Sequence, residues 1–147
     1  MNINHILIVM TEPKSIFLEI LFKYFSSKNF KSNTKKISVI GNISLLKKEI
    51  KKKKFKIKLN EVLDIKKSKK NFINLIDIKI SKKSRHTDIS KYISDCFDKS
   101  LSILKKNKNI ALLNGPVNKK TFLKKKYLGI TEYLAKKTNS KNPVMLI

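Results

Sequence analysis

The sequence predicts an α/β fold in which helices cover a layered β-sheet. Short continuous apolar runs, typical of buried strands, alternate along the chain with longer segments whose apolar residues recur every three or four positions, as in amphipathic helices. Strands that alternate with helices favour such a layered sheet. With 147 residues, 41% of them hydrophobic, the chain can form one domain or part of a larger one.

The first third of the chain contains two predicted strands, each followed by a helix. The apolar run HILIVM, residues 5–10, predicts the first buried strand, and Ser15 is the predicted N-cap of the helix after it. The spacing gives this helix one apolar face, made of Ile16, Phe17, Ile20, Leu21, Tyr24 and Phe25. Residues 36–41 predict the second strand. Ser44 is the predicted N-cap of the next helix, whose apolar residues are Leu45, Leu46 and Ile50.

The middle of the chain predicts two more strands and the longest helix. Residues 55–59 alternate apolar residues with lysine, as in a half-exposed strand, and residues 71–80 predict another strand after a polar connection at 66–70. A loop is predicted at 81–87. Asp88 then begins a helix that continues to Lys106, with an apolar stripe of Ile89, Tyr92, Ile93, Cys96, Phe97, Leu101 and Leu104. The stripe is typical of a core face, so we expect Cys96 to be an inert buried thiol.

The last third begins with a compact apolar strand, residues 110–113. Helical segments are predicted at 118–125 and 131–137, and PVMLI, residues 143–147, is typical of the first half of a strand. A chain that stops within a strand is expected to be part of a longer protein.

The segment from Asn114 to Thr131 carries the residues that suggest a binding site. Gly115 and Pro116 end the strand sharply, because glycine permits backbone angles that other residues avoid and proline fixes φ. Ligands of open α/β sheets bind outside the carboxyl ends of strands. Asn118 can cap a helix and Lys119 can face an anion, while Gly129 and Thr131 begin another helix whose free amides suit phosphate. The pattern matches neither a P-loop nor a dinucleotide motif, so an anion site and ordinary turn chemistry both remain open.

Several motifs in the chain resemble one enzyme family. These are GPVNK at 115–119, GITEYLAKKT at 129–138 and PVMLI at 143–147, with TEPKSIFLEI at 11–20. Taken in their order along the chain, these motifs resemble the N-terminal half of the 4-hydroxythreonine-4-phosphate dehydrogenase family of vitamin B6 (pyridoxine and pyridoxal phosphate) biosynthesis. That family has Gly-Pro-[Val/Ile]-x-Lys, Gly-His-Thr-Glu-[Phe/Tyr] and, near its start, Gly-[Asp/Glu]-Pro-Ala-Gly-Ile-Gly-Pro-Glu-Ile.

The resemblance implies a layered sheet of the isocitrate/isopropylmalate-dehydrogenase-like type, incomplete in this chain. Residues 1–147 would then be the N-terminal portion of a two-domain α/β dehydrogenase whose second half, with the metal ligands, is absent. By motif position, the substrate-binding residues are Thr131 and Lys119, and the loop contacts are Glu12, Gly115 and Asn118. No catalytic residue and no metal ligand is carried over.

Two departures from the family pattern affect the predicted pocket. Ile130 stands where the family has histidine, so one substrate contact is not carried over, and the glycines of the first motif are missing. His5 and His86 lie in no metal-ligand pattern, and we expect both to be bystanders.

The implied reaction oxidises the secondary alcohol of 4-(phosphooxy)-L-threonine with NAD or NADP, after which the β-keto acid loses CO2. A divalent metal (zinc, magnesium or cobalt) bound by histidines of the second half would stabilise the charge that develops, and the nicotinamide would accept the hydride. The resemblance implies a homodimer when full length, and this fragment alone is expected to be inactive. A related dehydrogenase acting on another phosphorylated hydroxy acid is an alternative.

The net charge of +25 suggests a different class, a lysine-rich nucleic-acid-binding protein. However, 34 of the 35 basic residues are lysines, and arginine, which makes bidentate base contacts, occurs only as Arg85. Lysine, isoleucine and asparagine, which all have A/T-rich codons, make up 69 of the 147 residues. Coding bias therefore explains the charge, and no nucleic-acid partner is expected.

The location predicted from the sequence is cytoplasmic. No apolar segment is long enough to span a membrane, and the first ten residues lack the basic start of a signal peptide. The single cysteine excludes an internal disulfide and suits a reducing compartment.

Overall fold

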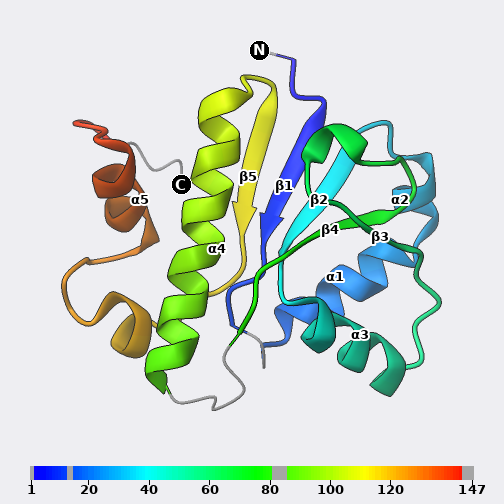
Figure 1. The fold of residues 1–147 in the computed structure, drawn as a ribbon, viewed down its shortest axis with the longest axis horizontal. Helices are drawn as coiled ribbons and strands as arrows, with labels where there is room; N and C mark the ends of the chain where they lie inside the picture. The colour runs from blue at the N-terminus through cyan, green and yellow to red at the C-terminus, as the bar shows by residue number, and fades with distance from the viewer. Residues whose placement is uncertain (1, 13–14, 81–85, 144–147) are drawn as a thin grey trace.

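A parallel five-stranded sheet forms the centre of the molecule (Figure 1). The computed structural model describes residues 2–12, 15–80 and 86–143. The strand order is β3-β4-β2-β1-β5, and every neighbouring pair is parallel. The strands are β1 (His5–Val9), β2 (Lys36–Gly41), β3 (Leu59–Glu61), β4 (Ile73–Asp77) and β5 (Ile110–Asn114). The predicted α/β fold class is confirmed.

Helices pack on both faces of this sheet, as Figure 1 shows. One face carries α1 (Phe17–Phe25), α2 (Lys28–Ser32) and α3 (Ile43–Lys52). The other face carries α4 (His86–Lys106), the short π-helix η2 (Lys119–Leu123) and α5 (Ile130–Thr138). A 3-10 turn, η1 (Ile65–Lys67), lies in the connection from β3 to β4.

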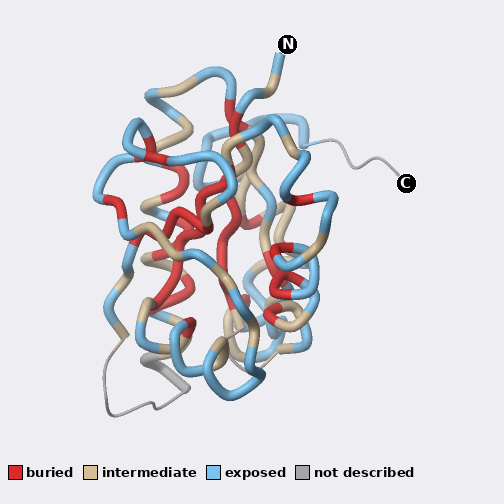
Figure 2. The backbone as a smooth tube through the Cα atoms, turned by 90° about the vertical axis from the view of Figure 1, so that its right-hand side faces the viewer, coloured by how far each residue is buried: buried red, intermediate tan, exposed pale blue. Residues whose placement is uncertain are grey.

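The two faces of the sheet form two separate apolar clusters. In β1, Leu7 and Val9 pack toward α4, whereas Ile8, and Met10 just after the strand, pack toward α1. Neighbouring side chains of a strand point to opposite faces, so a strand buried on both sides must be apolar at successive positions. Figure 2 shows the resulting buried segments in the middle of the molecule, with exposed backbone around them.

The buried face of α1 differs from the predicted one. The buried residues are Leu18, Leu21, Phe22 and Phe25, whereas the exposed fractions of Ile16, Ile20 and Tyr24 are 73%, 55% and 36%. The segment is apolar almost all round, so two faces satisfy the i, i+3 and i+4 spacing equally well. Packing on the sheet, which the spacing does not encode, selects between them.

Both predicted serine N-caps were wrong. Ser15 lies two residues before α1, and its hydroxyl donates to the carbonyl oxygen of Glu12 at 2.9 Å instead. The N-cap of α3 is Asn42, whose Oδ1 accepts from the N–H of Leu45 at 3.0 Å. Ser44 is an exposed residue in the first turn of α3. The helix begins earlier than predicted because an amide side chain directly after β2 already satisfies its first N–H groups.

The remaining elements lie close to their predicted positions. β3 comprises residues 59–61, and residues 55–58 form no strand, while β4 lies inside the predicted 71–80. α4 begins at His86, two residues before the predicted start. Residues 81–85 of the predicted loop and 144–147 of the predicted last strand lie outside the described residues.

The predicted apolar stripe of α4 is confirmed as a core face. Tyr92, Ile93, Cys96 and Phe97 are all buried against β1 and β2. Burial raises the pKa of the Cys96 thiol to about 12. The buried position expected for this cysteine is confirmed. The Tyr92 hydroxyl accepts a hydrogen bond from the N–H of Asn42 at 3.0 Å.

A line of buried polar side chains crosses the sheet on the α4 face. Nε2 of His5 and Oγ of Ser38 are 2.8 Å apart, and Oγ of Ser38 is 2.8 Å from Oγ of Ser68. Asn74 completes the group by donating to the carbonyl oxygen of Ile37 at 2.8 Å. Every buried side-chain nitrogen and oxygen in the described part of the chain has a hydrogen-bond partner. His5 therefore has a structural role between two strands.

Within the described ranges, none of the helices has the length and apolar character needed to cross a bilayer.

Candidate functional site

The candidate site lies where the chain leaves β1 and β5. These strands are neighbours, and their carboxyl ends lie at the same edge of the sheet (Figure 1). From β1 the chain continues to α1 on one face, and from β5 it continues to η2 on the other face. In open α/β sheets this divergence opens a crevice in which ligands bind. Three of the predicted site residues, Glu12, Gly115 and Asn118, lie on these two connections.

Gly115 allows the two connections to pack closely. Its N–H donates to the carbonyl oxygen of Val9 at 3.0 Å. A Cβ on Gly115 would lie 2.7 Å from Cδ1 of Phe17 and 2.9 Å from Oγ1 of Thr11. No described glycine has a positive φ. The expectation that Gly115 supplies unusual backbone angles was wrong, because what the position requires is the absence of a side chain.

Thr11 and Glu12 join the β1 connection to the β5 connection. The Thr11 hydroxyl, 2% exposed, donates to the carbonyl oxygen of Pro116. Oε1 of Glu12 accepts a hydrogen bond from the N–H of Asn118 at 3.1 Å. Two segments more than one hundred residues apart in sequence are therefore held together at the crevice.

Asn118 caps η2, as its sequence position predicts. Its Oδ1 accepts from the N–H groups of Lys120 at 3.0 Å and Thr121 at 3.2 Å. Lys119 follows as the first residue of η2, and it is exposed. The cap thus places an exposed lysine on the connection that leaves β5.

Thr131 lies on a different wall, at the start of α5. It lines an open hollow of about 290 Å³ together with Asn114 at the end of β5. Lys119 and Glu12 do not line this hollow. The structure therefore brings Glu12, Gly115, Asn118 and Lys119 together, and it connects Thr131 to them only through Asn114.

Two features of the first turn of α5 make it unlike an anion site with free N–H groups. Oε2 of Glu132 would lie 3.1 Å from a Cβ on Gly129, the N-cap residue, so a carboxylate already lies at this helix start, where the helix dipole favours it. Ile130 lines the hollow and also packs against the α4-side core. The position that is histidine in the family motif is therefore an apolar packing residue here.

Sequence reasoning missed Thr11 and Phe17 as parts of this site. Both lie in the TEPKSIFLEI motif at residues 11–20, but nothing in the spacing shows that they contact residues 115 and 116. Only the parallel pairing of β1 with β5 brings them there.

The described residues offer no metal site. They contain no group of three or more His, Cys, Asp or Glu side chains that could hold a metal ion. The side chains present here do not fit the divalent metal that the resemblance implies, so we derive no step through a metal on this chain.

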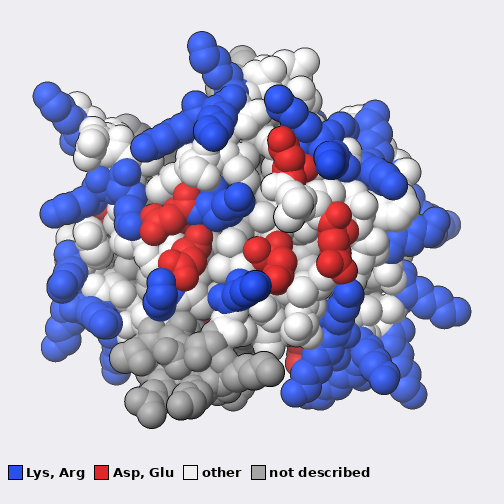
Figure 3. Space-filling view, in the orientation of Figure 1, with Lys and Arg blue, Asp and Glu red and all other residues white. Residues whose placement is uncertain are grey.

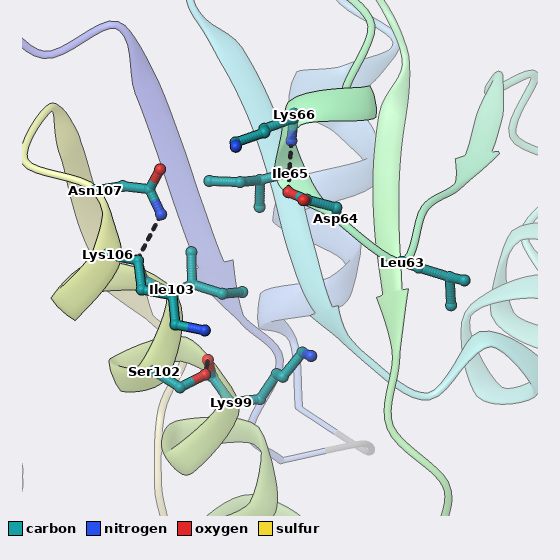
Figure 4. A pocket seen from close by; sticks show the side chains of 9 residues that line it. All are labelled: Leu63, Asp64, Ile65, Lys66, Lys99, Ser102, Ile103, Lys106 and Asn107. Carbon is teal, nitrogen blue, oxygen red and sulfur yellow. Dashed lines mark hydrogen bonds between the residues drawn. The ribbon is translucent and has the colours of Figure 1, made fainter.

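A second hollow, of about 390 Å³, lies between η1 and the C-terminal half of α4 (Figure 4). Ile65 and Ile103 line it, together with the lysine side chains of Lys66, Lys99 and Lys106. Lysine makes up 34 of the 147 residues, so composition alone predicts about two lysines among its nine lining residues. Three lysines are close to that background and do not indicate a ligand.

The charges on the face of Figure 1 are mixed. Figure 3 shows acidic side chains in the middle of this face and lysines spread around its edges. Ion pairs among the described residues include Lys47 with Glu61 at 2.7 Å and Lys137 with Asp98 at 2.8 Å. This face is not a continuous basic surface of the kind that neutralises a nucleic-acid backbone.

Comparison with protein families shows a match over most of the chain. The family described as pyridoxal phosphate biosynthetic protein PdxA matches residues 33–147. A search of curated proteins found no match.

Solved structures with a similar fold include two 4-hydroxythreonine-4-phosphate dehydrogenases. The Burkholderia phymatum structure has a TM-score of 0.80 and 18% identity, and the match covers 97% of this chain and 46% of that chain. The Klebsiella pneumoniae structure has a TM-score of 0.77 and 19% identity, and the match covers 92% of this chain and 45% of that chain. The chain therefore spans about half the length of the structures that it matches.

Proposed function

Because the chain belongs to the pyridoxal phosphate biosynthetic protein PdxA family, we propose that it supplies the first half of a 4-hydroxythreonine-4-phosphate dehydrogenase. The proposed reaction oxidises the secondary alcohol of 4-(phosphooxy)-L-threonine to a ketone. The hydride goes to NAD or NADP and the hydroxyl proton to solvent. The bond to the carboxylate then breaks and releases CO2, and the electron pair of that bond forms an enolate, which takes up a proton from solvent to give the amino ketone. The observation that carries the proposal is the family motif at residues 115–119, which lies on the connection after β5 at the crevice.

We assign substrate binding to Lys119 and Thr131. The Lys119 ammonium is exposed beside the crevice and can pair with a phosphate oxygen. The Thr131 hydroxyl, in the hollow beside Asn114, can donate to a polar group of the substrate. Glu12, Gly115 and Asn118 belong to the loops around them.

The remaining parts of the proposed enzyme belong to its second half. That half would supply the divalent metal and complete the nicotinamide site, and the proposed full-length form is a cytoplasmic homodimer. Coverage of about half of the matched structures supports this division. The chain alone is accordingly expected to bind substrate weakly and not to turn it over.

Titration of the isotope-labelled chain with 4-(phosphooxy)-L-threonine tests the binding site. We expect the amide resonances of residues 114, 115, 117–119 and 129–131 to shift together. Lys119→Gln and Thr131→Ala should each weaken binding by about tenfold, the equivalent of one lost polar contact of ~1.4 kcal/mol. Lys120→Gln is the matched control, since it removes the same charge from the adjacent position.

Turnover tests the reaction itself. The chain combined with a second half from a solved relative should form reduced nicotinamide, and Thr131→Ala should slow that formation. A folded, reassembled protein without turnover, or equal affinities for Lys119→Gln and Lys120→Gln, would contradict the proposal.

Ile130 favours a second candidate, a related dehydrogenase for another phosphorylated hydroxy acid. An isoleucine packed into the core cannot donate the hydrogen bond that a histidine offers at this position. Comparing the turnover of 4-(phosphooxy)-L-threonine with that of a phosphoerythronate-like acid by the reassembled protein separates the two candidates.

A further inference from the structure

The N–H groups at the start of η2 are already used within the protein. The N–H of Asn118 donates to Glu12, and those of Lys120 and Thr121 donate to the side chain of Asn118. An anion would have to displace one of these acceptors in order to bind the backbone there. In this segment, the exposed ammonium of Lys119 can meet an anion without breaking any of these bonds.

One of these acceptors, Glu12, comes from a second connection, the one that leaves β1, and this connection is itself firmly placed. Thr11 is buried, and its hydroxyl donates to the carbonyl oxygen of Pro116, two residues before Asn118. The N–H of Gly115 donates to the end of β1, and the ring of Phe17 packs on the Cα of Gly115. The connection after β5 is therefore held at Gly115, Pro116 and Asn118, the three points that precede Lys119.

We propose that Thr11 and Glu12 are positioning residues that together hold the loop carrying Lys119. Glu12 acts through its hydrogen bond to Asn118 and does not touch the ligand, so its functional atom is a hydrogen-bond acceptor and its charge is not required. Thr11 fixes the preceding peptide at Pro116. This inference rests on the proposed function only for the identity of the ligand that Lys119 meets.

Amide hydrogen exchange tests the positioning role without any substrate. In Glu12→Ala, exchange at Asn118 should rise by about tenfold, the effect of losing one hydrogen bond, while exchange in the buried strand β4 stays unchanged. Glu12→Gln keeps an Oε1 acceptor and should restore most of the protection. Thr11→Val should raise exchange at Asn118 as well, and Thr11→Ser should not. Glu49→Ala, a carboxylate removed from α3, is the matched control.

Binding of 4-(phosphooxy)-L-threonine gives the second readout. We expect Glu12→Ala to weaken binding and Glu12→Gln to bind as the unmodified chain does. Tighter binding by Glu12→Gln would overturn the inference, because it would mean that the Glu12 charge faces the phosphate. Unchanged exchange at Asn118 in Glu12→Ala would also overturn it. If the unmodified chain binds no substrate, the proposed function fails while the exchange results still decide the positioning role.

Discussion

The aromatic ring of Phe17 lies directly on the Cα of Gly115. A Cβ built on Gly115 would be 2.7 Å from Cδ1 and 2.8 Å from Cε1 of that ring, which is closer than such atoms approach in real proteins. On another side Oγ1 of Thr11 would be 2.9 Å away, and Thr11 is buried and hydrogen-bonded. The contact explains why a chain with three glycines keeps one after β5.

Gly115→Ala should destabilise the fold. The added methyl group forces the ring of Phe17 or the backbone to move, and overpacking of this kind lowers the free energy of unfolding by about 1–3 kcal/mol. Urea denaturation followed by circular dichroism measures the change.

Gly129→Ala is the matched control for this substitution. Its Cβ would meet only Oε2 of Glu132, at 3.1 Å, and that is the end of a flexible side chain. We expect a loss of less than about 1 kcal/mol, chiefly from placing alanine at an N-cap. Equal losses in the two variants would show that the Phe17 contact does not restrict residue 115.

Cys96 should react with thiol reagents only when the protein unfolds. Burial raises the pKa of its thiol to about 12, so almost no thiolate exists at pH 8, and the side chain is fully buried. Alkylation followed by mass spectrometry should be slow in buffer and should accelerate by orders of magnitude in concentrated urea. Cys96 is the only cysteine, so no other thiol contributes to the signal. Fast alkylation in buffer would contradict the buried position.

Tyr92→Phe should lower the free energy of unfolding by about 1–3 kcal/mol. The substitution removes the acceptor of the buried N–H of Asn42 and leaves that donor unpaired next to the cap of α3. Burial also raises the pKa of the Tyr92 hydroxyl, so it stays neutral across the accessible pH range. Tyr24→Phe is the control. Because Tyr24 is exposed, this substitution should change the free energy of unfolding by no more than about 0.5 kcal/mol. Similar losses in the two variants would remove the role assigned to the Asn42 bond.

The sequence was sufficient to predict those elements whose patterns have a single interpretation. The parallel strands β1 and β5 are mostly apolar runs, and the stripe of α4 recurs over many turns, so these elements were located nearly to the residue. The family was also predicted, because the motifs at 115–119 and 129–138 are short, ordered and uncommon, and the family match confirms it.

The errors have a common physical cause, since each depends on contacts between distant segments. The apolar residues around α1 permit two faces, and contact with the sheet decides between them. The role of Gly115 depends on Phe17, which lies 98 positions earlier in the numbering. The hydrogen bond from Asn118 to Glu12 likewise requires β1 beside β5, an adjacency that no local pattern encodes. The contacts around residues 115–118 were therefore less predictable than the family.

The stability of the protein should fall as the pH decreases below 6.5, because of His5. Burial in the sheet, and then the nearby charge of Lys36, lower the pKa of His5 from its ordinary value of 6.5. The unfolded chain therefore takes up a proton at a pH at which folded His5 remains neutral. The unfolded state binds more protons in this window. The contribution of His5 to the free energy of unfolding therefore has its full value above pH 6.5 and decreases as the pH falls toward the folded pKa.

Urea denaturation at a series of pH values from 7 to 5 measures this dependence, and His5→Asn should flatten it. The carboxylate of Glu19 does not interfere: its hydrogen bonds with Lys53 and Lys23 lower its pKa from 4.5 to about 2, so its effect is lost only at more acidic pH. His86→Asn, measured in the same series, shows how much of the pH dependence comes from the other histidine. An unchanged slope in His5→Asn would show that protonation of His5 is not the source of the pH dependence.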